Sequence, residues 1–147
     1  LRKTCLIMKI KYKKSAILER LVEIISEFSE NRTSLTDDEI GDLRAGLAAG
    51  SYIFAEQIVQ TEYLAVLEAT MAYERAEGET FEQELGAAIK EGWSRSQAID
   101  IARKTSRTND AYVQAFNDLQ AAKTHLNIHN MLLSQINQVL NAMSKRS

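Results

Sequence analysis

The chain contains no proline, and its six glycines all lie at or before Gly92. Proline and glycine are the residues that most often end helices and build turns, so residues 93–147 lack both of the strongest helix breakers. A single cysteine, Cys5, excludes an intrachain disulfide and a cysteine zinc cage. No run approaches the roughly 20 consecutive apolar residues of a membrane span. These absences favour a helical chain, and we expect no membrane partner.

The N-terminus also lacks the features of a secretory signal. Its apolar stretch from Cys5 to Met8 is short and ends at Lys9, whereas a signal needs about 7–15 apolar residues. The length of 147 residues predicts one domain. We therefore expect an intracellular, non-secreted, single-domain protein.

Charge is strongly segregated along the chain, although the net charge is only −2. Residues 1–20 sum to +6, residues 21–92 sum to −12, and residues 93–147 sum to +4. Such asymmetry is typical of polar self-assembly or of a nucleic-acid face kept apart from an acidic face. Ordinary surface variation along helices explains it equally well.

The N-terminal third is expected to hold a basic arm and short helices. Residues 1–14 form the arm, and the alternation of apolar and lysine residues within 8–13 is compatible with a short strand or a flexible segment. Residues 15–49 show a helical apolar spacing, interrupted by a polar loop. Thr36 begins a Thr-Asp-Asp-Glu capping box that starts a new helix. Gly50 either ends that helix or lies within a longer one.

One long helix is predicted for residues 51–76. Apolar and aromatic side chains recur there at intervals of three and four, which places them on one helical face. The predicted inward-facing residues are Tyr52, Ala55, Val59, Tyr63, Val66, Thr70 and Tyr73.

A helical corner is predicted for residues 80–107. Gly78 is expected to end the preceding helix, and the Thr80-Phe-Glu-Gln sequence resembles another capping box. Gly92 is expected to end the helix that starts there, and Ser94 to begin the next one. The corner would then separate two long helices.

The strongest pattern is an apolar heptad seam in a helix predicted for residues 109–145. Such a seam needs a partner helix, and residues 51–76 are too short to cover it, so the sequence predicts a homo-oligomer. The predicted fold is all-α, with long antiparallel helices in a hairpin or coiled-coil-like arrangement. The seam residues are Tyr112, Leu119, Leu126, His129, Leu133, Ile136, Leu140 and Met143.

Chemistry-bearing motifs are scarce. His125 and His129 have a spacing that can hold a metal, but neither has a carboxylate three residues before it, as a di-iron bundle requires. A polar residue in the seam is the better interpretation of His129, since such residues fix register. Phosphate-loop and nucleophile-elbow sequences are absent. We therefore expect no enzymatic activity, no metal and no cofactor.

Basic residues mixed with hydroxyl side chains are suited to phosphate contacts. Two such clusters occur, one in the N-terminal arm and one in the predicted corner, and the arm includes a tyrosine that can stack on a base. The predicted nucleic-acid-binding residues are Lys9, Lys11, Tyr12, Lys13, Lys14, Arg95, Arg103, Lys104 and Arg107. A simply solvated basic face is the alternative.

Residues 56–143 resemble a family of small phage proteins, the recombination mediators that load a recombinase onto single-stranded DNA. The similarity lies in a long helix containing EYLAVLEATMAYERAEGET, a helical corner, and a helix from Asp110 through Tyr112 and Asp118 to a terminal Ser-Lys-Arg. The resemblance implies a homo-oligomer in the bacterial cytoplasm that binds single-stranded DNA, a recombinase and a single-strand binding protein. The family's basic residues on the first long helix are not matched, because Arg75 is the only basic residue in 51–76.

Two other classes of function stay open. The chain can be a structural or adaptor protein, such as a virion or assembly component, that binds no nucleic acid. A helical-bundle metalloenzyme is the third class, which the missing Glu-x-x-His motif disfavours.

Overall fold

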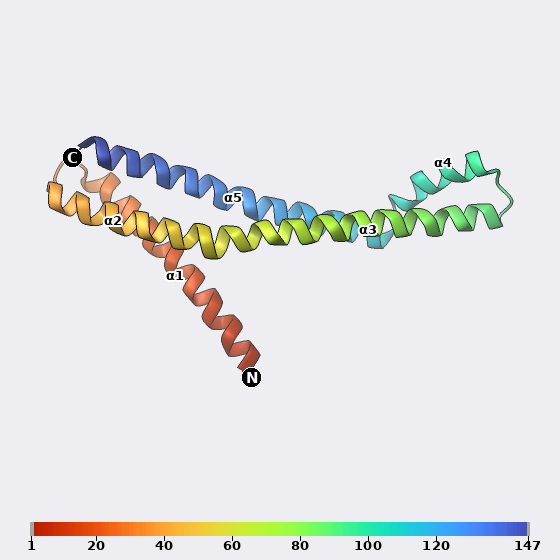
Figure 1. The fold of residues 1–147 in the computed structure, drawn as a ribbon, viewed down its shortest axis with the longest axis horizontal. Helices are drawn as coiled ribbons and strands as arrows, with labels where there is room; N and C mark the ends of the chain where they lie inside the picture. Colours follow the sequence, from red (N-terminus) through yellow and green to blue (C-terminus); the bar gives the residue numbers. More distant parts are fainter. Residues whose placement is uncertain (1, 147) are drawn as a thin grey trace. The chain divides into compact units, whose positions relative to one another are not determined.

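The computed structural model describes the backbone of residues 2–146 and the side chains of residues 16–145. All regular structure within these residues is helical, which confirms the all-α prediction (Figure 1). No helix in the described chain is both long and apolar enough to cross a bilayer. In chain order the elements are α1 (Arg2–Asn31), α2 (Asp37–Phe54), the π-helical segment η1 (Ala55–Val59), α3 (Gln60–Lys90), α4 (Arg95–Ser106) and α5 (Asp110–Arg146).

The helices group into two compact units. Unit 1 comprises residues 1–61 and 128–147, and unit 2 comprises residues 62–127. The segment that alternates over residues 8–13 is helical rather than a strand, because α1 already begins at Arg2. The side chains of the predicted basic arm lie outside the described residues.

The core of unit 1 is formed by one face each of α1 and α2, by η1 and by the last part of α5. These helices contribute large apolar side chains that recur three or four residues apart, so each helix turns one stripe inward. The Thr36 capping box starts α2 as predicted: the Thr36 hydroxyl accepts from the Glu39 N–H at 3.2 Å. The buried cluster is Leu21, Ile24, Phe28, Ile40, Leu43, Leu47, Phe54, Ile58, Ile136 and Met143.

Gly50 lies inside α2 and does not end it. A Cβ added there would lie 2.8 Å from Cδ2 of Leu21, a fully buried side chain of α1. The glycine is therefore needed for the close approach of two helices. Of the two possibilities left open by the sequence, the structure selects the continuous helix.

The predicted stop at Gly78 and restart at Thr80 are both wrong, because α3 runs without a break from Gln60 to Lys90. The Thr80 hydroxyl donates to the carbonyl of Ala76 at 2.7 Å, one turn back in the same helix. Serine and threonine hydroxyls in mid-helix often bond to the carbonyl four residues before them. The capping-box sequence was therefore misleading, and the corner is limited to the connection that follows Lys90 and to α4.

The π-helical segment η1 explains a second correction, in the inward face of the predicted 51–76 helix. Its wider turn shifts the side chains around the axis. Phe54 and Ile58 are buried in the core of unit 1. Tyr52 and Tyr63, which were predicted to face inward, are 68% and 53% exposed. From Val66 through Thr70 to Tyr73 the predicted stripe is at least half-buried, as expected.

In unit 2, the turn between α3 and α4 follows the prediction. Gly92 has a φ of +95°, which glycine adopts at little cost. The Trp93 N–H donates to the Ala88 carbonyl and the Gly92 N–H to the Ile89 carbonyl, the Schellman pattern of a helix end. Ser94 then caps α4, its hydroxyl accepting from the Gln97 N–H. The helix buries Ala98, Ala102 and Ser106, spaced by four.

The seam of α5 faces inward within a single chain. Leu119, Ile136 and Met143 are buried, and the other seam residues are partly buried. The sequence predicts a homo-oligomer because a facing helix of residues 51–76 is too short to cover the seam. That helix length is wrong, since helical backbone runs continuously from Asp37 to Lys90. The seam consequently gives no support to a homo-oligomer.

Candidate nucleic-acid interface

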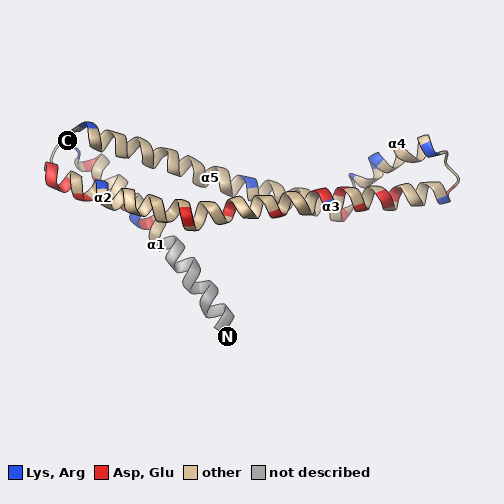
Figure 2. Cartoon of the chain, in the orientation of Figure 1, with Lys and Arg blue, Asp and Glu red and all other residues tan. Residues whose placement is uncertain are grey.

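The exposed face of α4 is basic. Arg95, Arg103 and Lys104, together with Arg107 at the C-cap, have exposed side chains, and Figure 2 shows basic segments along α4. By helical spacing, Lys104 and Arg107 point away from the buried small residues of the helix, whereas Arg95 lies on their side. Cations in the last helical turn also complement the negative end of the helix dipole. The local fold thus explains part of this pattern without any ligand.

Arg103 and Arg107 both line a polar pocket of about 370 Å³ within unit 2. The two residues are one helical turn apart, so their guanidinium groups can act on the same ligand. The other residues that line the pocket are Tyr73, Glu77, Phe81, Ser106 and Tyr112.

A tyrosine pair forms one side of this pocket. The hydroxyls of Tyr73 on α3 and Tyr112 on α5 lie 2.9 Å apart, and their ring centroids are 5.4 Å apart. The hydrogen bond to Tyr112, together with burial and the nearby Glu77 carboxylate, raises the pKa of Tyr73 to about 12. Tyr73 therefore stays neutral at physiological pH, and the hydroxyl pair adds polar hydrogen-bonding groups to the pocket.

The two arginines are available for a ligand. Among the residues that the structure describes, neither guanidinium takes part in a hydrogen bond or an ion pair. Glu77 lies at the same pocket and interacts with the Tyr73 hydroxyl, so its charge offsets one of the two positive charges. A planar guanidinium binds phosphate oxygens with two parallel hydrogen bonds. The arrangement can hold a single phosphate group.

The other predicted binding residues are not gathered at this pocket. Lys104 is exposed but does not line it. Arg95 is the first residue of α4, eight positions before Arg103, which corresponds to about 12 Å along the helix axis. The five arm residues Lys9, Lys11, Tyr12, Lys13 and Lys14 have side chains outside the described part of the chain.

The sequence missed three contributors to the pocket. Glu77 and Phe81 lie on either side of the wrongly predicted helix break, so their common face was not recognised. Tyr112 was assigned to the seam, and its pairing with Tyr73 across a 39-residue separation has no local sequence signal. The alternating pattern placed each tyrosine inward but did not identify its partner.

The two histidines do not form part of this pocket. His125 is exposed, and His129 is partly buried with its ring edge-on to Phe54 at 5.3 Å between centroids. Within the described residues, no cluster of three or more histidine, cysteine or acidic side chains could hold a metal.

Two exposed aromatic side chains of unit 2 lie near the basic residues of α4 or near their pocket. Trp93 immediately precedes the Ser94 cap of α4, and Phe116 lies with its ring centroid 6.1 Å from that of Tyr73. Both rings are more than two-fifths exposed.

Comparison with known proteins gives no further information on the site, because no family model, no curated protein and no solved structure matches the chain.

Proposed function

We propose that the chain is a non-enzymatic accessory protein that binds single-stranded DNA through phosphate contacts on α4. The observation that carries the proposal is the pair of unpartnered guanidinium groups of Arg103 and Arg107 beside the tyrosine hydroxyls. Phosphate contacts supply essentially all of the affinity of sequence-independent nucleic-acid binding. The charge and geometry of this pocket suit such a contact.

Flexible single strands fit this surface better than a duplex does. Single-strand binding combines phosphate contacts with aromatic rings on which bases stack. Phe116 is 43% exposed beside the tyrosine pair, and Trp93 is 47% exposed next to Arg95. A strand following the basic face of α4 would meet an exposed ring near each end of its path.

The direct test is charge reversal at the pocket. The double variant Arg103→Glu/Arg107→Glu should abolish binding of a fluorescent oligothymidylate at about 50 mM salt, where electrostatic binding is strong. The matched control is Arg75→Glu/Lys123→Glu, which makes the same change in net charge at exposed positions of unit 2. Equal loss of binding in both variants would indicate a general charge effect and contradict the assignment of this pocket.

A structural or adaptor role without DNA binding is the second candidate, favoured by an apolar row on α3. Leu64, Leu67 and Met71 are spaced by three and four, so they share one face, and all are exposed, as is the neighbouring Tyr63. Rows of exposed large apolar side chains are typical of interaction surfaces. This row, rather than the α5 seam, is the surface through which copies of the chain would associate.

The row also provides the test of the adaptor role. Leu67→Glu should lower the molar mass measured by light scattering if copies of the chain associate there. The same variant should reduce binding of a recombinase or a single-strand binding protein if such a partner docks on the row. If Leu67→Glu changes neither and the unmodified chain binds no single-stranded DNA, both candidate functions fail.

A further inference from the structure

A second pocket, independent of the proposed DNA site, lies in unit 1 between α2 and α5. Its volume is about 330 Å³. The space exists because α2 presents small residues, Gly41 and Ala48, on the face that lines the pocket. The large apolar side chains of Ile40, Leu140 and Met143 form most of the remaining wall, and the exposed residues Ala45 and Arg44 complete it. The pocket is thus apolar and continuous with the core of the unit.

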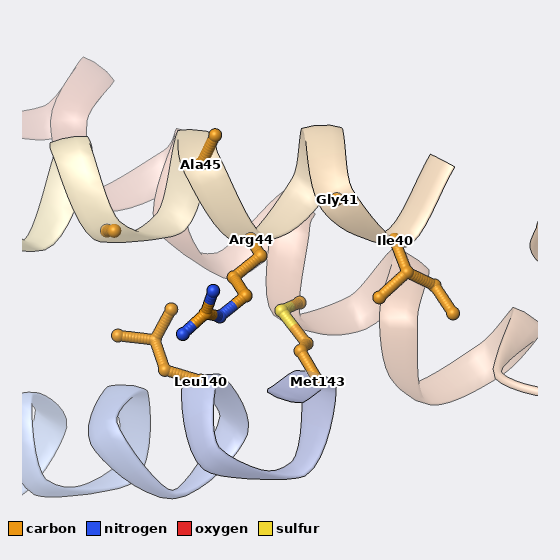
Figure 3. A pocket seen from close by; sticks show the side chains of 7 residues that line it. Ile40, Gly41, Arg44, Ala45, Leu140 and Met143 are labelled. Carbon is orange, nitrogen blue, oxygen red and sulfur yellow. The ribbon is translucent and has the colours of Figure 1, made fainter. Parts of the chain in front are cut away.

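One charged side chain contributes to this apolar pocket. Figure 3 shows the Arg44 side chain extending from α2 toward α5, with its guanidinium group between Leu140 and Met143. Two other arginines of the unit are engaged: Arg20 pairs with Glu23 at 3.4 Å, and Arg32 lies over the Phe28 ring at 5.5 Å. The Arg44 guanidinium has no hydrogen bond or ion pair with any described residue.

An apolar cavity beside a single guanidinium selects a ligand that carries one bulky apolar group and one carboxylate. Arginine binds carboxylates with paired hydrogen bonds. Both walls are helices, whose backbone amides are already bonded internally, so Arg44 must supply the polar recognition. The volume lies at the low end for ligand pockets, which fits one side chain better than a long acyl chain. Asp37, Asp38 and Asp42 on the same helix disfavour a strongly acidic ligand.

The apolar group and the carboxylate must also be close together. Adjacent side chains in an extended peptide point in opposite directions, and side chains two residues apart are separated by about 7 Å. An internal acidic residue and an apolar residue are therefore poorly placed to enter one small pocket together. At a carboxyl terminus, the carboxylate and the side chain share one Cα. An α-carboxyl group has a pKa of about 3.5 and is ionised at neutral pH.

We propose that the Arg44 pocket binds the carboxyl-terminal residue of a partner polypeptide. Its bulky apolar side chain lies against Ile40, Leu140 and Met143, and its terminal carboxylate pairs with Arg44. A second protein could thereby be attached to unit 1 while α4 remains free to bind DNA.

The glycine at the pocket gives a way to block the site without breaking the fold. A Cβ added at Gly41 meets no atom within 4 Å, so Gly41→Leu has room and places its side chain beside the cavity. Leucine is also a better helix former than glycine, so unfolding is not the expected result. Gly86→Leu is the matched control, since Gly86 lies inside α3 and is equally unobstructed. For the charge, Arg44→Gln is compared with Arg75→Gln.

The probes are fluorescein-labelled hexapeptides made of glycine and serine that end in leucine with a free carboxylate. Two control peptides differ only in an amidated carboxyl terminus or in a terminal serine. For a single-residue anchor we expect a dissociation constant on the order of 10–1000 µM, measured by fluorescence anisotropy with the full chain. Amidation, the terminal serine, Arg44→Gln and Gly41→Leu should each weaken binding by about tenfold or more. The two control variants should bind as the unmodified chain does.

Three outcomes would overturn the proposal. The first is no binding of the free-carboxylate peptide at about 1 mM protein, because a specific one-residue contact should have a dissociation constant of about 1 mM or lower. The second is equal binding of the amidated peptide, which would remove the role of Arg44. The third is unchanged binding by a folded Gly41→Leu chain, which would place the peptide elsewhere.

Discussion

Replacing single glycines by alanine tests the continuity of the helices, because three glycines of this chain occupy physically different positions. Gly78 lies in the middle of α3, and a Cβ there meets nothing within 4 Å. Alanine at an open helical position stabilises by about 1 kcal/mol relative to glycine. For a chain of this size the melting temperature should rise by about 2–4 °C.

The other two glycines should not give this increase in stability. Gly92 has a φ of +95°, and a left-handed conformation costs a residue with a Cβ about 1–2 kcal/mol, so Gly92→Ala should be destabilising. At Gly50 the helix propensity gain of about 1 kcal/mol competes with overpacking against Leu21, which costs about 1–3 kcal/mol. The added Cβ would lie 2.8 Å from Leu21 Cδ2. Gly50→Ala should therefore be neutral to destabilising by about 2 kcal/mol.

The assay is urea unfolding followed by far-ultraviolet circular dichroism, with the three variants compared under one set of conditions. The structure predicts that Gly78→Ala alone raises the unfolding midpoint. If Gly78 instead ended a helix in a left-handed conformation, Gly78→Ala would lower the midpoint as Gly92→Ala does. That result would refute the unbroken α3 helix.

Three further predictions concern individual contacts. Thr80→Val should change stability by less than about 0.5 kcal/mol, because a mid-helix hydroxyl that bonds back to Ala76 stabilises little; a loss near 1 kcal/mol in urea unfolding would instead indicate an N-cap. Ile136→Ala should cost about 2–5 kcal/mol, since the side chain is fully buried, and a change below about 1 kcal/mol would contradict the unit 1 core. Tyr112→Phe should return the pKa of Tyr73 from about 12 toward its ordinary value of 10.0, measured by tyrosinate absorbance. Because the folded-state pKa is raised, the Tyr73 contribution to stability is complete below pH 10 and declines between pH 10 and about 12, and this decline should be smaller in Tyr112→Phe.

The features of the fold that could be predicted from the sequence are those with local causes. Thr36 and Ser94 are N-caps that bond to a backbone N–H three residues later in the chain. Gly92 lies just before the Ser94 cap. These helix boundaries have local causes and were predicted correctly. The helix of residues 110–146 could be predicted because no breaker interrupts its heptad pattern. The errors at Gly78 and Thr80 arose because a glycine and a hydroxyl are compatible with both a helix end and a helix interior. The local sequence around these two residues does not distinguish a helix end from a helix interior.

Prediction of the candidate site depended on a long-range contact. The spacing of Arg103 and Arg107 identified a basic face from local sequence alone. Their pocket could not be predicted, because it needs Tyr73 and Tyr112 to meet across helices. The homo-oligomer was expected because the helix facing the seam was predicted to span only residues 51–76. That helix is longer, since η1 joins α2 and α3 without a break. The π-helical turn η1 changes which side chains of the helix face inward, and nothing in the sequence indicates such a turn.

The salt dependence of single-stranded DNA binding tests the central claim most directly. For single strands, the slope of log affinity against log salt is about −0.7 per phosphate neutralised. If Arg103 and Arg107 each neutralise one phosphate, Arg103→Gln/Arg107→Gln should make the slope less negative by about 1.4, while Arg75→Gln/Lys123→Gln should leave it unchanged. An identical slope for the unmodified chain and Arg103→Gln/Arg107→Gln, or no binding by the unmodified chain at about 50 mM salt, would contradict phosphate recognition by these two arginines.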